Sequence, residues 1–368
     1  LKVGTKLSAT SEGKGASHNV HLLDPHRLLK RPTLILGADV THHVLDVSVA
    51  GVVASRDKHF VNYFAELRGQ AAFDFADGEL KARRRKSEER ILELAGMATA
   101  LLNRWKDANG RLPEVILYYR DGVSNGQFGP VLTYELNCLA RAFKEVGGEG
   151  YNPELAITVG QKRHHTRFFK DAEAETISDH RAGAFAKGGS VFEKGKKGGK
   201  VGKGDAFIKG AKGKGKPGFE VQVGPGTVAA EGIAEPGPLN FFMVSQNSGL
   251  GTAVPCHYYV LHLDPRLTES FNIDDIERIT YDLCHLYSRA DKAVGYASPA
   301  YMADHLCERG KQYLEAEFGT EPSDCSTTAG SDDEEMIKRR ISKRVSWLNS
   351  RWASGAAKSL LQGRNFFC

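Results

Sequence analysis

Residues 115–121 read Val-Ile-Leu-Tyr-Tyr-Arg-Asp, an apolar run that stops at a pair of charged residues. Residues 34–39, Leu-Ile-Leu-Gly-Ala-Asp, repeat this pattern, because a short apolar stretch is again followed by an aspartate. Apolar runs of this length without alternation are typical of strands buried on both faces of a sheet. The two segments therefore predict central strands, each carrying an aspartate at its carboxyl end.

The rest of the chain alternates between strand and helix patterns. Further strands are predicted over residues 48–55, 60–67, 155–159, 239–244 and 257–263. Helices are predicted over residues 87–105, 128–146, 273–289, 299–318 and 337–348, with a loop over 319–335. Three early strands followed by alternating helices and strands predict an α/β fold, a mixed central sheet covered by helices.

Length and composition are ordinary for a globular protein. The 368 residues are 41% apolar and 26% charged, and no stretch approaches the ~18–20 apolar residues of a membrane span, so we expect no membrane partner. The chain starts without methionine or a signal peptide, which favours a fragment of a longer protein. Six scattered cysteines without zinc-type spacing favour free thiols in a reducing compartment, and we expect a cytoplasmic protein.

Basic charge is concentrated in one low-complexity segment. Residues 186–218 contain 10 lysines, 11 glycines and two acids, a net charge of +8, so the rest of the chain carries about −3. Such a composition buries too little apolar surface to offset its ordering entropy, which predicts a flexible insert over about residues 171–220. Both a solvated insertion and an arm that binds nucleic acid fit this composition.

Asp39 and Asp121 would lie together at one edge of the predicted sheet. In open α/β sheets, ligands bind beyond the carboxyl ends of the parallel strands. Two carboxylates at such an edge repel each other, and a divalent cation relieves the repulsion. Oxygen ligands favour Mg²⁺ or Mn²⁺ over zinc. The pattern alone is equally compatible with two aspartates that cap turns.

A basic cluster follows another predicted strand, where residues 161–167 read Gln-Lys-Arg-His-His-Thr-Arg. A solvated charged face is the usual explanation of such a run. Its position between a buried-type strand and Phe168-Phe169 suits contacts to phosphates made from a fixed scaffold. Adjacent histidines, here and at His42-His43, point apart on a strand and lack partners at ligand spacing, which argues against zinc.

Together these blocks resemble the PIWI domain of eukaryotic Argonaute proteins. The matching blocks, in family order, are residues 37–42 (Gly-Ala-Asp-Val-Thr-His), 119–128 (Tyr-Arg-Asp-Gly-Val-Ser-Asn-Gly-Gln-Phe), 162–167, 251–258, 287–289 (Tyr-Ser-Arg) and 299–301 (Pro-Ala-Tyr). The Gly/Lys insert and a lengthened segment before residue 87 look most like a fungal quelling-type member. The resemblance implies an RNase H-like PIWI domain over residues 25–368, preceded by the C-terminal edge of a MID domain and a linker over residues 1–24.

The resemblance also implies an activity: a small-RNA-guided endoribonuclease (slicer) of RNA silencing that works by two-metal hydrolysis with Mg²⁺ or Mn²⁺. Asp39 and Asp121 match the family's metal-binding carboxylates, and Asp304 matches the fourth position, where animal members usually have histidine. The family's glutamate, carried on a mobile finger, matches Glu89 when counted back from the next helix, although an insertion upstream leaves Glu88 open. The implied catalytic set is Asp39, Glu89, Asp121 and Asp304, with the three aspartates as metal ligands.

The implied partners are a small guide RNA and a complementary target RNA, with silencing-complex proteins beyond them. Lys2 and Lys6 match two lysines that bind the guide 5′ phosphate, and Arg309 matches the arginine that the PIWI domain contributes. Positions that hold the guide backbone correspond to Lys162, Arg163, Arg167, Arg289 and Tyr301. Val254 stands where animal members have arginine, so we expect one backbone contact to be missing.

Two other functions fit part of the pattern. One is a guide-loaded binding module that recruits partners without cutting, and the other is a different RNase H-like nuclease that acts on DNA. Four acids at the family's positions argue against the first alternative. The N-terminal lysines and the basic block at residues 162–165 argue against the second.

Overall fold

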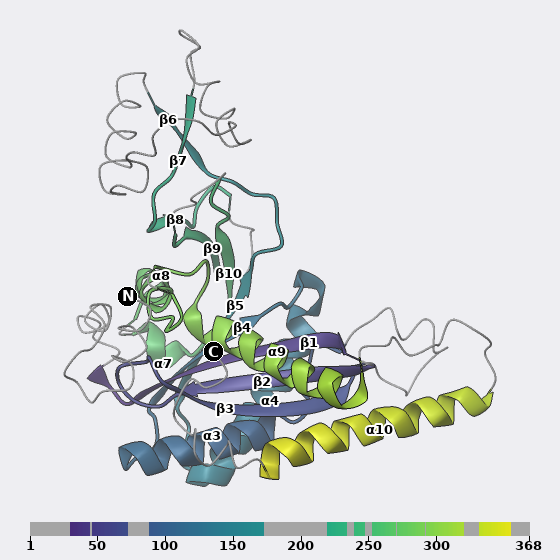
Figure 1. The fold of residues 1–368 in the computed structure, drawn as a ribbon. Coiled ribbons are helices and arrows are strands. Elements are labelled where there is room, and N and C mark those ends of the chain that lie inside the picture. Colours follow the sequence, from purple (N-terminus) through teal and green to yellow (C-terminus); the bar gives the residue numbers. More distant parts are fainter. Residues whose placement is uncertain are drawn as a thin grey trace, which may run out of the picture.

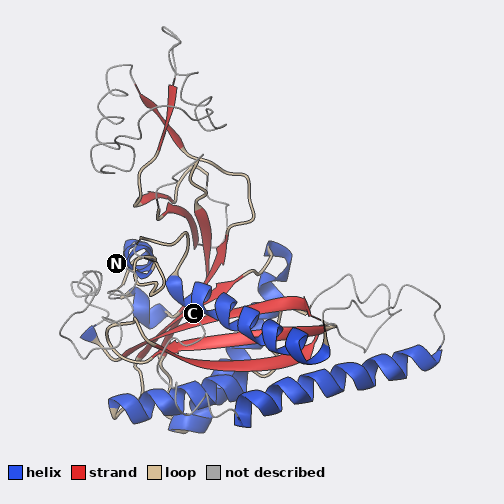
Figure 2. Ribbon diagram, viewed as in Figure 1, coloured by secondary structure: helices blue, strands red, loops and turns tan. Residues whose placement is uncertain are grey.

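In a computed structural model of the chain, the described residues are 30–44, 46–72, 88–172, 219–233, 239–246, 252–269, 271–290, 292–319 and 331–354. They form a mixed eight-stranded sheet with helices on both faces and a separate two-stranded ribbon (Figures 1 and 2). The strands are β1 (Thr33–Val44), β2 (Val47–Ser55), β3 (Tyr63–Ala71), β4 (Val115–Asp121), β5 (Glu154–Gln161), β6 (Phe169–Ala172), β7 (Phe219–Gln222), β8 (Thr227–Ala229), β9 (Leu239–Val244) and β10 (Cys256–Leu263). The helices are α3 (Leu94–Asn109), η3 (Asn125–Gln127), α4 (Phe128–Gly147), α7 (Pro265–Thr268), α8 (Ile273–Leu283), α9 (Ser298–Phe318) and α10 (Ser331–Ser354).

The large sheet has the strand order β3-β2-β1-β4-β5-β10-β9-β8. Its centre is parallel, since β4 pairs in parallel with both β1 and β5, and antiparallel strands flank it on both sides. The predicted mixed α/β sheet is confirmed. Ala38 of β1 lies beside Arg120 of β4, so the next residues, Asp39 and Asp121, lie together where this parallel pairing ends. Asp121 ends β4 as predicted, but Asp39 does not end its strand, because β1 continues to Val44 in antiparallel pairing with β2.

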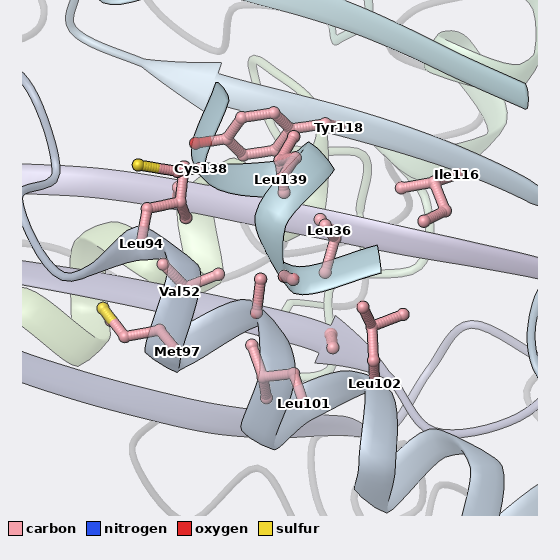
Figure 3. Packing of buried hydrophobic residues seen from close by; sticks show 14 of the residues in the cluster. Leu36, Val52, Leu94, Met97, Leu101, Leu102, Ile116, Tyr118, Cys138 and Leu139 are labelled. Carbon is pink, nitrogen blue, oxygen red and sulfur yellow. The ribbon is translucent and has the colours of Figure 1, made fainter. Parts of the chain in front are cut away.

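Helices α3 and α4 cover one face of this central region (Figure 3). Leu36 of β1 and Tyr118 of β4 pack into the same buried cluster as Leu94 and Leu101 of α3 and Leu139 of α4. Successive side chains of a strand point to opposite faces of a sheet. Burial of residues 36 and 118 under these helices therefore directs the side chains three positions later, those of the two aspartates, to the opposite face.

Helix α9 lies directly on that opposite face. A Cβ atom at Gly37 would be 2.1 Å from the carbonyl oxygen of Pro299, and one at Gly51 would be 2.8 Å from Sγ of Cys307. Side chains larger than glycine at these positions would push the helix away from β1 and β2. The close approach brings Asp304, which lies between these two helix contacts, over β1.

Several predicted boundaries were wrong. The helix expected from residue 87 begins at Leu94, because residues 88–93 bond to neighbouring elements instead of to a helix of their own. The strand expected from residue 60 begins at Tyr63, because Phe60 lies in a turn with a φ of 54°. Helix α8 ends at Leu283, well before residue 289, because the Val294 N–H donates to the carbonyl of Cys284 and closes a loop. Helix α10 begins inside the predicted loop.

Strands β6 and β7, which the sequence did not predict, pair as a ribbon at the two ends of the Gly/Lys insert and point away from the large sheet (Figure 1). Most of the insert predicted over 171–220, and all of the MID edge and linker predicted over 1–24, lie outside the described residues. The cysteines within the described residues are free and buried; they are Cys138, Cys256, Cys284 and Cys307. No helix in the described part of the chain has the length and apolar character of a membrane span.

Candidate active site

Three aspartates from three elements converge where the parallel pairing of β1 and β4 ends. Burial, together with the negative charges of Asp39 and Asp304, raises the pKa of Asp121 to about 7. Burial, followed by the charge of Asp39, raises the pKa of Asp304 to about 6. Burial also raises the pKa of Asp39, which is 7% exposed. The charge of Asp39 thus raises the pKa of both other aspartates, because the structure holds the three carboxyls close together.

Glu89 reaches the same place from the segment before α3. Its Oε1 lies 3.0 Å from Nε2 of His42, three residues after Asp39 on β1, and its charge raises the pKa of Asp39. Glu88 points elsewhere, since its carboxylate accepts the backbone N–H of Arg90 at 2.9 Å and the Nε of the same arginine at 2.7 Å. Of the two glutamates that the sequence left open, the structure brings Glu89 to the aspartates.

A buried arginine links these acidic residues. Arg120 is 1% exposed, and its Nη1 lies 3.9 Å from Oδ1 of Asp39. The same guanidinium donates to two backbone carbonyls, that of Asp121 at 2.5 Å and that of Glu89 at 2.7 Å. Its Nε donates to Glu135 of α4 at 3.3 Å. The cation partly offsets the repulsion, since it lowers the pKa of Asp39 against the larger effect of burial.

Sequence reasoning did not assign Arg120 or His42 to the site, although both lie inside the quoted motifs. The available signal for Arg120 was a charged residue inside a strand that is otherwise apolar, because such a charge needs a partner when it is buried. A third missed residue is Tyr296, whose hydroxyl hydrogen-bonds to Asp121 and thereby lowers the pKa of that carboxyl against the effect of burial. Nothing in the local sequence around this tyrosine pointed to the contact.

Part of the predicted guide-backbone set lies beside the acids. Nζ of Lys162 lies 5.3 Å from the ring centroid of Tyr296, whose ring is 5.0 Å from that of Tyr301. The ring of His305 lies 4.8 Å from that of Tyr301. Burial lowers the pKa of His305, and the charge of Arg289 lowers it further. Lys162, Tyr301 and Arg289 thus form one basic and aromatic surface next to the carboxylates.

In the described part of the chain, the contacts seen for the other predicted residues do not involve the Tyr296 and Tyr301 rings. Arg167 donates to the backbone carbonyl of Thr166 in its own segment at 2.7 Å, and Arg163 is exposed. Arg309 lies half-buried on α9, five residues after Asp304. The two lysines assigned to the 5′ phosphate, at positions 2 and 6, lie outside the described residues. The predicted phosphate pocket is therefore represented here by the arginine alone.

The donor chemistry of the site suits a hard divalent cation. Asp39, Asp121 and Asp304 offer only carboxylate oxygens, the ligands that Mg²⁺ and Mn²⁺ prefer. The repulsion among these carboxylates raises their pKa values, and a bound cation would relieve that repulsion. Among the described residues, no three acidic, histidine or cysteine side chains are already arranged to hold a metal ion. The three aspartates fit a divalent cation by their ligand chemistry and by their charge.

Comparison with known proteins is consistent with this geometry. Residues 5–315 match the Piwi domain family. The chain is 30% identical over 318 residues to protein argonaute-2 of Drosophila melanogaster, covering 85% of this chain and 21% of that protein. It is 31% identical over 310 residues to protein argonaute 11 of Oryza sativa subsp. japonica, covering 83% of this chain and 30% of that protein. The chain thus spans less than a third of the length of these relatives.

Solved structures show the same fold. The C-terminal lobe of a budding yeast Argonaute aligns with a TM-score of 0.62 and 25% identity, over 89% of this chain and 56% of that one. Kluyveromyces polysporus Argonaute, solved with a guide RNA, aligns with a TM-score of 0.59 and 26% identity, over 82% of this chain and 29% of that one. The expected RNase H-like fold is thereby confirmed, while fly, rice and yeast relatives do not single out the quelling type. The chain belongs to the Piwi domain family and is a homologue of the Argonaute proteins.

Proposed function

We propose that this chain is the cleaving part of a small-RNA-guided endoribonuclease, which cuts RNA complementary to a bound guide in the course of RNA silencing. The observation that carries the proposal is the convergence of Asp39, Asp121 and Asp304 with Glu89 where β4 ends beside β1. A protein that only held a guide would gain nothing from gathering four acids whose mutual repulsion opposes folding.

The chemistry assigned to the site is hydrolysis of a phosphodiester. Bound at the three aspartates, Mg²⁺ or Mn²⁺ would polarise the scissile phosphate and lower the pKa of the attacking water. The residues of the chain set the geometry for this: His42 orients the Glu89 carboxylate, and Tyr296 orients Asp121. Arg120 anchors the backbone on both sides of the site and limits the accumulated negative charge.

Guide binding is assigned to the neighbouring basic and aromatic surface. Lys162 offers an ammonium group over the Tyr296 ring, and Tyr301 lies against the same ring. Phosphate contacts of this kind position a nucleic acid without reading its sequence. The yeast relative solved with a guide RNA supports a guide RNA as the ligand. Target RNA and silencing-complex proteins are proposed as the further partners.

Cleavage by the complete protein tests the proposal. The protein is loaded with a 5′-phosphorylated guide RNA and given a labelled complementary RNA with Mg²⁺, and we expect one cut at a fixed distance from the guide 5′ end. Asp39→Asn and Asp121→Asn should abolish the cut while leaving guide affinity within about threefold, because these side chains belong to the acidic cluster. Asp107→Asn, at an exposed position of α3, is the matched control and should cleave normally.

Two results would decide against the proposal. Undiminished cleavage by Asp39→Asn would remove the acidic cluster from the reaction. Tight guide binding by the parent without any cleavage in Mg²⁺ or Mn²⁺ would instead establish the alternative function, a guide-loaded binding module that does not cut.

A further inference from the structure

The segment that carries Glu89 has no secondary structure of its own. Residues 88–93 precede α3, which begins at Leu94, and they belong to no strand. Buried backbone N–H and C=O groups need hydrogen-bond partners in a folded protein. Several of the groups around Glu89 find these partners on neighbouring elements, and the identity of the partners determines where the Glu89 carboxylate lies.

Gln70 of β3 provides two of these partners. Its Nε2 donates to the carbonyl oxygen of Arg90 at 2.8 Å, and its Oε1 accepts the N–H of Leu92 at 3.0 Å. A side-chain amide offers the same donor and acceptor as a peptide group. Gln70 thus pairs with the segment as an additional strand residue would, and it does so at a position that is only 4% exposed.

Further contacts of the segment come from other elements and act on other groups. The Glu88 N–H donates to the carbonyl of Ala72 at 3.1 Å, just past the end of β3. The hydroxyl of Tyr134 on α4 donates to the carbonyl of Leu92 at 2.8 Å. Arg120 bonds to the Glu89 carbonyl itself. These bonds hold the backbone before, at and after the glutamate, and Gln70 bonds to the residues that follow it.

We propose that Gln70 is a positioning residue for catalysis, which holds Glu89 at the aspartates by pairing with the backbone of Arg90 and Leu92. This inference rests on the proposed function, because Glu89 matters for positioning only if the site cleaves. The buried location sets the strength of the effect, since an unpaired polar group away from water is costly and the segment would shift to reach solvent.

The chain offers a closely matched control in an amide of α10 that bonds to the same strand. Oδ1 of Asn349 on α10 accepts the N–H of Gly69 at 2.7 Å, and its Nδ2 donates to the Gly69 carbonyl at 3.4 Å. This amide also makes two bonds with backbone groups, one residue away from Gln70, but it ties down α10. Gln70→Leu and Asn349→Leu remove equivalent bonds at similar side-chain volume, and only the first should affect Glu89.

The first measurement is single-turnover cleavage by the complete, guide-loaded protein over a range of Mg²⁺ concentrations. We expect Gln70→Leu to lower the rate by about 100-fold, the loss that a misplacement of about 1 Å produces. It should also raise the Mg²⁺ concentration needed for half-maximal rate, because Glu89 no longer completes the acidic cluster. Asn349→Leu should lower thermal stability comparably and leave the Mg²⁺ requirement unchanged.

The second measurement does not depend on cleavage. Hydrogen exchange of peptides covering residues 88–94 should become about tenfold faster in Gln70→Leu, as expected for the loss of one protecting bond at Leu92, and remain unchanged in Asn349→Leu. Unchanged exchange in Gln70→Leu, or equal Mg²⁺ dependence in the two variants, would overturn the inference. A parent protein that does not cleave would overturn the proposed function instead, and the exchange experiment would still decide whether Gln70 holds the segment.

Discussion

Replacing Asp121 with asparagine should stabilise the fold at pH 8 while removing cleavage. Burial and the charges of Asp39 and Asp304 raise the pKa of Asp121 from 3.8 to about 7. The folded chain therefore binds a proton that the unfolded chain has already lost, and the unfolding free energy falls as the pH rises from about 4 to about 7. Asparagine keeps the shape and the hydrogen-bond acceptor for Tyr296 but carries no charge, so the variant should escape this loss.

The size of the effect follows from the two pKa values. Their difference corresponds to about 4 kcal/mol at pH 8, and to about 1.6 kcal/mol at pH 5, where the pH is close to the unfolded-state value. The Asp121 carboxyl is partly exposed and shares its repulsion with Asp39, so we expect about half of these values. Asp121→Asn should therefore raise the unfolding free energy by about 2 kcal/mol at pH 8 and by less than about 1 kcal/mol at pH 5. For a chain of 368 residues, about 2 kcal/mol raises the thermal midpoint by about 3 °C, because the entropy of unfolding grows with chain length.

Thermal unfolding of the parent and of Asp121→Asn, at pH 5 and pH 8 without divalent cations, measures this difference. Adding Mg²⁺ at pH 8 should stabilise the parent more than the variant and narrow the gap, because a ligand that binds only the folded state raises its stability. Asp107→Asn, on the exposed side of α3, should show no pH-dependent difference. A variant that melts at or below the parent temperature at pH 8, or gains equally at both pH values, would refute the reasoning.

Three further outcomes follow from the site. Glu89→Gln should lower single-turnover cleavage by at least about 100-fold, whereas Glu88→Gln should stay within about threefold because the Glu88 carboxylate pairs with Arg90. A cleavage gel with equal guide loading separates the two variants, and equal losses would contradict the assignment of Glu89 to the site. At limiting Mg²⁺, cleavage by the parent should rise with pH through about 6–7, the range in which Asp304 and Asp121 lose their protons. Saturating Mg²⁺ should move this rise to lower pH because the cation competes with protons, and a pH profile unaffected by Mg²⁺ would count against the cluster as the metal site. Lys162→Met keeps the aliphatic stem but should weaken guide binding several-fold. It should also lower the slope of log affinity against log salt by about 0.7, the value for one single-strand phosphate contact, and an unchanged slope in filter binding would remove Lys162 from the guide surface.

Local pattern alone predicted the central strands and the aspartate that ends β4. The apolar runs before Asp39 and Asp121 predict buried strands because a sheet covered by helices on both faces needs apolar side chains on both faces. Parallel pairing then brings the two aspartates together, as the register of Ala38 beside Arg120 shows, although β1 continues past Asp39 to Val44. The long helices were predictable for the same reason, because helical spacing of apolar residues is visible within a few turns.

The choice between Glu88 and Glu89 depended on the tertiary structure. The two glutamates are adjacent and chemically alike, so no local pattern distinguishes them. What separates them is a set of partners far away in the sequence: His42 on β1, Arg120 on β4 and Gln70 on β3. The same contacts keep residues 88–93 out of the helix that periodicity predicted.

The position of Asp304 was likewise decided by packing. Its place near the other acids results from the close approach of α9 to β1 and β2, which the missing side chains at Gly37 and Gly51 permit. Neither glycine has a feature that reveals this role in the sequence, because the clash that it avoids involves residues more than 200 positions away. Strand ends and helix periods are local properties of the chain, whereas the distances among four acids are properties of the packed fold.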